Sequence, residues 1–118
     1  MKKIAIIFSQ SPFRSALSRE GQDMLLALCA VEHQLTVIYL ADAVLQLLPT
    51  SPTAALGCKD FTPAQALFAL YDVHQVVVCQ QSVAHWRLSA AEFRIAADVL
   101  ASGQITQLLQ QQQHILRF

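Results

Sequence analysis

Short runs of β-branched and aromatic residues alternate along this chain with segments of helical periodicity. Four such runs predict strands, at residues 3–8, 35–40, 76–79 and 114–118. The segments between them predict helices over residues 19–32, 41–48 and 63–71. Because helical crossovers join strands that run in the same direction, this order predicts an α/β fold, with a parallel sheet and helices on both of its faces.

The first predicted helix carries its own start signal. Ser18 suits the N-cap position, and Glu20 in the first turn is favoured by the helix dipole. One helical face gathers the apolar residues that we expect to be buried, which are Gly21, Met24, Leu28 and Val31.

Capping-box spacing occurs at two later places, Thr62–Gln65 and Ser89–Glu92. The first has Pro63 at the first helical position, so it should begin the third predicted helix. After the second, helical spacing and strand alternation fit equally well, the helix through Phe93, Ala96, Ala97 and Leu100 and the strand through Phe93, Ile95, Ala97 and Val99. The pattern therefore leaves residues 89–101 open between helix and strand. A further helix, up to about residue 113, is predicted by Ile105, Leu108 and Leu109.

Composition adds a question about the surface. The 118 residues have the length of one domain, and we expect a single domain over residues 1–118. The chain is 54% hydrophobic and only 14% charged, whereas globular chains carry about 25% charged residues. The excess indicates either a surface covered by another subunit or a sheet buried on both sides. Because the net charge is zero, direct nucleic-acid binding is not expected.

The N-terminus begins like a signal peptide, but its apolar run, Ile4 to Phe8, is too short for one. No run approaches the roughly 20 apolar residues of a membrane span. Three cysteines without C-x-x-C spacing argue against a disulfide framework and for a reducing compartment. We therefore expect a cytoplasmic protein that does not contact a membrane.

Cys79 is the strongest candidate for a reactive residue, because it ends the apolar run "VVVC". In an open parallel sheet, ligands bind outside the carboxyl ends of the strands. If a helix begins after Cys79, its N-terminus would favour the thiolate, and His85 and Arg87 would add positive charge. Such a thiol would pass on sulfur or form a mixed disulfide. The alternative is a buried cysteine that packs as a small hydrophobic residue.

The remaining candidates for chemistry are weaker. Cys29 lies beside the apolar stripe of the first helix and should fill a core or an interface, and Cys58 should be exposed in a Pro- and Gly-containing loop. No cofactor is expected, because three glycines are too few for a dinucleotide fingerprint. No metal is expected either, because none of the histidines has a partner at metal-ligand spacing, these being His33, His74, His85 and His114.

Polar residues after the first strand share the predicted sheet edge with Cys79. They are the serines Ser9, Ser11 and Ser15, which would either cap helices or bind phosphate as in flavodoxin-type loops. Asp42 and Asp72 stand alone and are expected to cap turns, so no acid–base pair is predicted.

Five stretches, in this order and spacing, are familiar together: "FSQSP", "REGQDMLLALCA", "ADAVLQLLP", "LYDVHQVVVCQQS" and "ILRF". Across nearly the whole chain they resemble the TusC-like chains of the DsrE/DsrF-like sulfurtransferase families. The resemblance implies a five-stranded, mostly parallel sheet with flavodoxin-like layering. It also implies that residues 93–97 form a strand and that residues 101–113 form a helix.

The same resemblance implies an accessory role. TusC-like chains assemble with TusB-like and TusD-like chains into a heterohexamer with two copies of each. That complex relays persulfide sulfur from a TusA-like carrier to a TusE-like carrier, for 2-thiouridine at tRNA wobble positions. Cys79 matches the place of the sulfur-accepting cysteine in TusD-like chains, but "QQS" replaces the small residues that follow it there. A non-catalytic subunit is therefore favoured over a sulfurtransferase with Cys79 as carrier, and a free-standing ligand-binding module is the third hypothesis.

Overall fold

A computed structural model of the chain describes all residues except 1, 11–16, 32, 49–64, 66 and 72. The described residues form one sheet of five strands, β1 (Lys2–Phe8), β2 (His33–Tyr39), β3 (Gln75–Cys79), β4 (Asp98–Leu100) and β5 (His114–Arg117). The helical segments are α1 (Leu17–Leu28), η1 (Ala41–Leu47), α3 (Leu67–Leu70), α4 (Gln80–His85), η3 (Ala90–Glu92) and α5 (Ser102–Gln110), where η marks a 3₁₀ helix.

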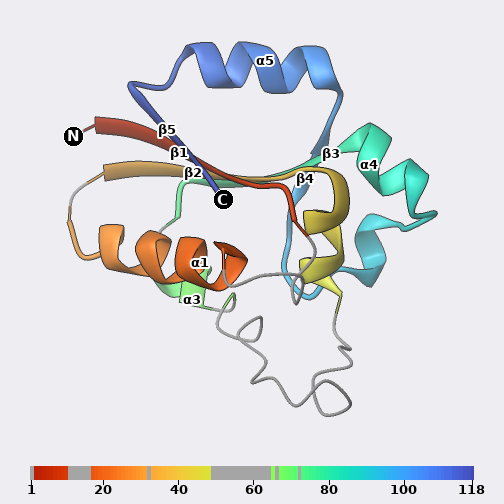
Figure 1. Ribbon diagram of the computed structural model, residues 1–118, viewed down its shortest axis with the longest axis horizontal. Coiled ribbons are helices and arrows are strands. Elements are labelled where there is room, and N and C mark those ends of the chain that lie inside the picture. The colour runs from red at the N-terminus through yellow and green to blue at the C-terminus, as the bar shows by residue number, and fades with distance from the viewer. Residues whose placement is uncertain (1, 11–16, 32, 49–64, 66, 72) are drawn as a thin grey trace.

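The sheet has the strand order β4-β3-β2-β1-β5, and every neighbouring pair is parallel. Figure 1 shows α5 on one face of the sheet and α1, α3 and η1 on the other. We call these the α5 face and the α1 face. The predicted α/β fold, a parallel sheet with helices on both faces, is confirmed. The carboxyl ends of β1, β2 and β3 meet at one edge of the layered structure, the edge on which the predicted chemistry depends.

Strand alternation divides the core into two parts. On the α1 face, β1 contributes Ile4, Ile6 and Phe8, which pack with Leu25 of α1 and Phe68 of α3. The smaller cluster on the α5 face consists of Ile7, Ile38, Val77, Cys79 and Ile105. Because successive side chains of a strand point to opposite faces, the central strands need apolar residues at every position. This two-sided burial accounts for part of the apolar composition.

The strand that the resemblance implied at residues 93–97 is wrong, since β4 begins only at Asp98. The preceding segment is held by η1 rather than by a strand, because the Arg94 amide donates to the Leu47 carbonyl at 2.6 Å. The Arg94 guanidinium also donates to the Leu48 carbonyl at 3.2 Å. The alternation of Phe93, Ile95 and Ala97 does face the core on the α1 face. The alternation therefore reflects burial of one side of this segment, although the segment does not pair as a strand.

The predicted buried face of the first helix is also partly wrong. The buried residues of α1 are Ser18, Gly21, Gln22 and Leu25. Met24 and Val31 are exposed. Ser18 is not the N-cap, because it lies inside α1 and its hydroxyl accepts a hydrogen bond from the Gln46 side chain at 2.9 Å. The helix turns this polar face inward because η1 offers a hydrogen-bonding partner there.

The other predicted elements are found with shifted ends. Residues 41–48 do form a helix, although of the 3₁₀ type, and the helix predicted up to residue 113 ends at Gln110. Of the third predicted helix, Leu67–Leu70 form α3, and the Thr62–Gln65 motif lies largely outside the described residues. The Ser89–Glu92 motif closes a single 3₁₀ turn, in which the Glu92 amide donates to the Ser89 carbonyl. Within the described part of the chain, no helix is long and apolar enough to cross a membrane.

Candidate functional site

Cys79 lies where the sequence predicted it, at the carboxyl end of β3 and directly before α4. Its backbone is extended, with φ −76° and ψ 125°, and it occupies the N-cap position of α4 without a side-chain capping bond. Its neighbour across the sheet is Leu100, the last residue of β4. The strand-end position of this thiol is therefore as expected.

The direction of the Cys79 side chain is set by strand alternation. Val77 and Cys79 belong to the cluster on the α5 face, whereas Val78 belongs to the α1 face. Cys79 therefore lies in the apolar cluster that also contains Ile7, Ile38 and Ile105, and the residue is only 8% exposed. This environment is that of a small hydrophobic residue in a core.

The positive charges that we expected beside Cys79 are not brought to it. His85 is the last residue of α4, and six helical residues span about 9 Å. The His85 ring instead meets the edge of Trp86, with ring centroids 5.3 Å apart. Arg87 follows with a positive φ of 54° and is exposed. No hydrogen bond between the described residues joins either side chain to the thiol.

Ser82 is a structural partner that the sequence analysis did not single out. Its hydroxyl, in the first turn of α4, accepts a hydrogen bond from the backbone amide of Ala41 at 2.8 Å. Ala41 follows β2 and has a positive φ of 50°, a strained conformation for a residue with a side chain. The contact ties the turn after β3 to the turn after β2. The only local signal for it was a hydroxyl residue near a helix start.

Ser9, the first serine of the predicted loop, hydrogen-bonds to residues at the end of β5 and not to Cys79. The Ser9 amide donates to the Phe118 carbonyl at 3.0 Å, and the Ser9 hydroxyl accepts from Arg117 Nε at 3.4 Å. Ser9 therefore fastens the chain after β5 to the end of β1. Ser11 and Ser15 lie outside the described residues, as do Cys58 and Asp72. Asp42 lies in the first turn of η1.

The remaining candidates lie apart from this edge. Cys29 follows α1 and packs against the core of the α1 face. Burial raises the pKa of its thiol, which disfavours the nucleophilic thiolate. Among the residues that the structure describes, no three His, Cys, Asp or Glu side chains are grouped to hold a metal ion.

Buried amides form a second polar feature beneath the sheet edge. Gln46 donates from Nε2 to the Ser18 hydroxyl at 2.9 Å and to the Gln10 carbonyl at 3.0 Å. Gln65 donates from Nε2 to the Gln46 carbonyl at 2.9 Å. These bonds connect α1, η1 and the chain before α3. No local pattern marked Gln46 or Gln65 as buried, because glutamine is usually a surface residue.

Tyr39 stands beside these amides at the end of β2 and is fully buried, stacked on Phe8 with ring centroids 5.2 Å apart. Burial raises the pKa of the Tyr39 phenol well above its ordinary value, although the Gln65 side chain opposes that rise. The hydroxyl has no hydrogen-bond partner of ordinary geometry among the described residues. Ionisation of Tyr39 is therefore suppressed in the folded state.

This burial predicts a loss of stability at alkaline pH. Above about pH 10 the unfolded chain ionises Tyr39 while the folded chain does not, so stability falls by about 1.4 kcal/mol per pH unit from this group. The stability contributed is fully present below pH 10 and is lost as pH rises. Tyr39→Phe should remove that dependence and change stability at pH 7 by less than about 1 kcal/mol. Urea denaturation of both proteins between pH 8 and 11 measures it, and parallel curves would contradict it.

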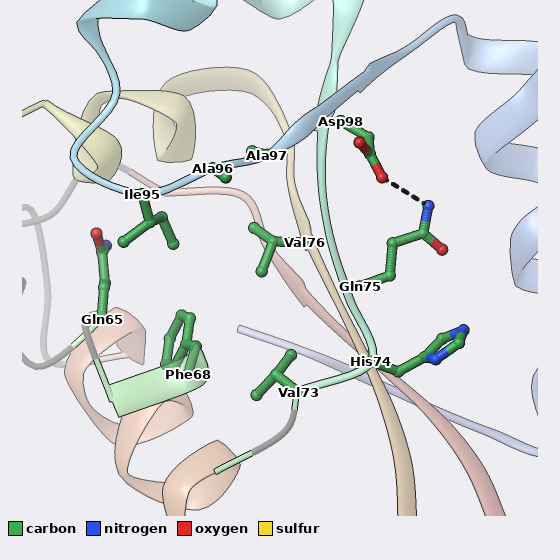
Figure 2. A pocket seen from close by; sticks show the side chains of 10 residues that line it. All are labelled: Gln65, Phe68, Val73, His74, Gln75, Val76, Ile95, Ala96, Ala97 and Asp98. Carbon is green, nitrogen blue, oxygen red and sulfur yellow. Dashed lines mark hydrogen bonds between the residues drawn. The ribbon is translucent and has the colours of Figure 1, made fainter. Parts of the chain in front are cut away.

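A pocket of about 380 Å³ opens at the opposite end of β3. In Figure 2 the apolar side chains of Phe68, Val76 and Ile95 point into the space between α3 and the segment before β4. Gln75 points away from them and donates to Asp98 at 3.2 Å. The pocket is on the α1 face, whereas the Cys79 side chain is on the α5 face. The structure does not unite them in one site.

Comparison with known proteins shows which family this chain belongs to. The profile of the DsrE/DsrF-like family matches residues 2–118. A protein named TusC homolog from Vibrio parahaemolyticus is 39% identical over 118 residues, covering 100% of both chains. A TusC homolog from Vibrio vulnificus is 35% identical over the same length, again with 100% of both chains covered.

Solved structures show the same fold at lower sequence identity. The ychN protein from E. coli superposes with a TM-score of 0.84 at 19% identity, covering 100% of both chains. The protein MTH1491 of unknown function from Methanobacterium thermoautotrophicum superposes with a TM-score of 0.64 at 14% identity, covering 98% of this chain and 96% of the other. The five-stranded parallel layout is thus shared among chains with very different sequences.

Proposed function

Because the chain belongs to the DsrE/DsrF-like family, among its TusC-like members, we propose that it is an accessory subunit of a heteromeric sulfur-relay complex. In this proposal it assembles with TusB-like and TusD-like chains into a heterohexamer. The complex takes persulfide sulfur from a TusA-like carrier and delivers it to a TusE-like carrier. The relay ends at 2-thiouridine in tRNA wobble positions, and this chain itself binds neither tRNA nor a membrane.

The burial of Cys79 is the observation that carries the accessory role. Sulfur passes between carriers when a thiolate attacks the outer sulfur of a persulfide, so the acceptor must reach the donor. Cys79 is 8% exposed and belongs to a cluster with isoleucines on the α5 face. The other buried members of this cluster are all aliphatic. The geometry therefore supports a subunit that positions a catalytic partner.

The outer surface supports assembly. Several large apolar side chains are exposed on different elements, namely Leu17, Met24, Val31, Tyr71, Trp86, Val99, Ile115 and Leu116. Single exposed apolar residues are ordinary, but so many on a chain with few charges are typical of a surface covered by other subunits.

A second function, in which Cys79 is itself a persulfide carrier, is favoured by one observation. Cys79 ends β3 at the carboxyl edge of the sheet and precedes the first turn of α4, the region where parallel α/β sheets bind ligands. As a carrier, the Cys79 thiolate would attack the outer sulfur of a donor persulfide and displace the donor thiolate. The new persulfide would then be passed on in the same way. That chemistry requires the α5 face to open around the thiol.

We expect Cys79→Ser to leave tRNA thiolation nearly unchanged, within about twofold, because in the accessory role this thiol only fills space. Deletion of the whole chain should abolish thiolation, since the catalytic partner then loses its support. The measurement is the 2-thiouridine content of tRNA from cells carrying each variant.

Cys29→Ser is the matched control, because Cys29 is also a free cysteine but is only partly buried and lies on the α1 face. If Cys79→Ser abolished thiolation while Cys29→Ser did not, and if the Cys79→Ser protein still copurified with its partners, the carrier hypothesis would replace the accessory one. Normal thiolation after deletion of the chain would contradict both.

A further inference from the structure

A single crossing segment covers the α5 face. The strands β4 and β5 lie at opposite edges of the sheet, and the chain between them crosses this face as α5 (Figure 1). We call residues 101–112, which comprise α5 and its flanking residues, the α5 strap. Of the residues in the cluster on this face, only Leu40 lies outside both the strands and the strap. The strap is therefore the main cover of that cluster.

Few apolar side chains hold the strap against the sheet. Among the nine residues of α5, all of which the structure describes, Ile105 alone is buried. Leu108 and Leu109 are partly buried against the same cluster. On the other face, α1 and η1 each bury four residues. Because the free energy that holds a helix on a sheet grows with the apolar area that it buries, the strap is the more weakly held cover.

The polar contacts of the strap do not hold it down either. Its side-chain hydrogen bonds among the described residues all stay within it, from the Ala101 amide to Gln104 Oε1 at 2.9 Å, from the Thr106 hydroxyl to the Ser102 carbonyl at 3.0 Å and from Gln112 Nε2 to the Leu108 carbonyl at 3.1 Å. Residues 99–113 contain no charged side chain, so the strap itself has no charge with which to form an ion pair. Lifting it therefore costs mainly apolar burial.

The strap is fastened just beyond its ends. The Gln113 amide donates to the Lys3 carbonyl at 2.8 Å, and Gln113 Oε1 accepts from the Lys3 amide at 2.9 Å. At the other end, Ala101 follows β4, whose Leu100 is in register with Cys79. Both ends can thus stay on the sheet while the middle lifts. A helix of nine residues is too short to be stable alone in water, so lifting also melts α5.

Gln112 favours the lifted state. Its Oε1 atom is buried and has no hydrogen-bond partner among the described residues. A buried polar atom without a partner costs free energy that water recovers when the atom becomes exposed. Opening of the strap returns this oxygen to water.

We propose that the α5 strap opens by itself, while the rest of the fold stays intact, and that this opening exposes the Cys79 thiol to disulfides and persulfides. Cys79 is 8% exposed and shares its cluster with Ile105, so the closed strap shields it. Segments with little apolar burial open at a lower free energy than the whole fold. The thiol therefore reacts through a minor open state and not through global unfolding.

This inference goes beyond the proposed function and does not rest on it. An accessory subunit needs no reactive thiol, and its assembly with partners is measured separately by what copurifies with the chain. The carrier hypothesis does need the α5 face to open, and the strap supplies a route that leaves the other face of the sheet folded.

The reactivity of Cys79 towards an aromatic disulfide, dithiobis(nitrobenzoate), tests the proposal. Each reacting thiol loses its proton to solvent, and the thiolate attacks one sulfur of the probe to form a mixed disulfide and release one thionitrobenzoate anion. The full chain carries Cys29→Ser and Cys58→Ser, so that Cys79 is its one cysteine. Labelling is followed by the mass of this chain, which bound partners do not disturb. We expect labelling at least a hundredfold slower than that of a short cysteine peptide.

Two matched substitutions separate strap opening from global unfolding. Ile105→Val removes one methylene from the strap, and Ile6→Val removes the same group from β1 on the α1 face, where Ile6 is fully buried. Both lower global stability by a similar amount. We expect Ile105→Val to speed labelling of Cys79 by about threefold to tenfold and Ile6→Val to change it by less than about 1.5-fold. Equal acceleration by both, no acceleration by Ile105→Val, or labelling as fast as the peptide would overturn the proposal.

Hydrogen exchange provides a second readout without changing the strap. Because opening melts α5, its helical amides should exchange at least tenfold faster than those of β1 and β2, once each is corrected for its intrinsic rate. The opening constant from α5 should agree with that from Cys79 labelling within about threefold. Amides of α5 as slow as those of β1, or two opening constants that disagree, would show that the strap does not control access to the thiol.

Discussion

Replacing Gly21 with alanine should destabilise the protein by up to about 2 kcal/mol, the remainder of an overpacking cost of about 1–3 kcal/mol after the gain in helix propensity. A Cβ at this position would lie 2.6 Å from Cγ of Phe118 and 2.7 Å from Cε1 of Phe8, both closer than carbon atoms approach in folded proteins. Phe8 is fully buried under α1, so the ring of Phe118 or the helix itself must move. This cost exceeds the gain of about 1 kcal/mol that alanine brings over glycine within a helix.

Gly103→Ala is the matched control, because Gly103 also lies in a helix, α5, and a Cβ there meets nothing within 4 Å. We expect it to stabilise the protein by about 0.5–1 kcal/mol. Urea denaturation of the three proteins measures both effects. Stabilisation by Gly21→Ala of the same size as by Gly103→Ala would contradict the packing of α1 on the C-terminal residue.

Replacing Gln46 with alanine should cost about 2–4 kcal/mol. The change removes two hydrogen bonds, to Ser18 and Gln10, each worth about 1 kcal/mol. It also leaves a cavity at a residue that is 1% exposed, for which truncation carries a further penalty. Because Gln46 links η1 to α1, hydrogen exchange should rise in both helices.

Gln107→Ala serves as its control, since Gln107 is exposed on α5 and alanine should change stability there by less than about 0.5 kcal/mol. Thermal and urea denaturation provide the comparison. Equal effects of the two substitutions would show that the buried amide contributes nothing to joining the helices.

The strands could be predicted because their signal is local. Each central strand is buried on both faces, so runs such as residues 76–79 appear as continuous apolar stretches. Residues 93–97 show the limit of this signal. Their alternation correctly reflects one side packed on the core, but the hydrogen bonds of Arg94 go to η1. Tertiary structure decides which acceptor a backbone amide donates its hydrogen bond to.

The position of Cys79 in the fold could be predicted from the sequence, but its accessibility to solvent could not. That Cys79 ends a strand follows from its place in the apolar run. That its side chain points to the α5 face, into a cluster with Ile105, depends on the register of β3 and the docking of α5. The inward face of α1 was missed for a related reason, because its polar residue Ser18 becomes buried where it meets Gln46 of η1.

The proposed accessory role is tested most directly by native mass spectrometry of the tagged chain, purified from its own host without reductant. The account predicts a complex with two related small partners in equal amounts and no added sulfur on Cys79. A reductant-sensitive gain of one sulfur atom, mapped to Cys79, would contradict it and make this chain a carrier. Recovery of the chain without any partner would contradict the proposed assembly itself.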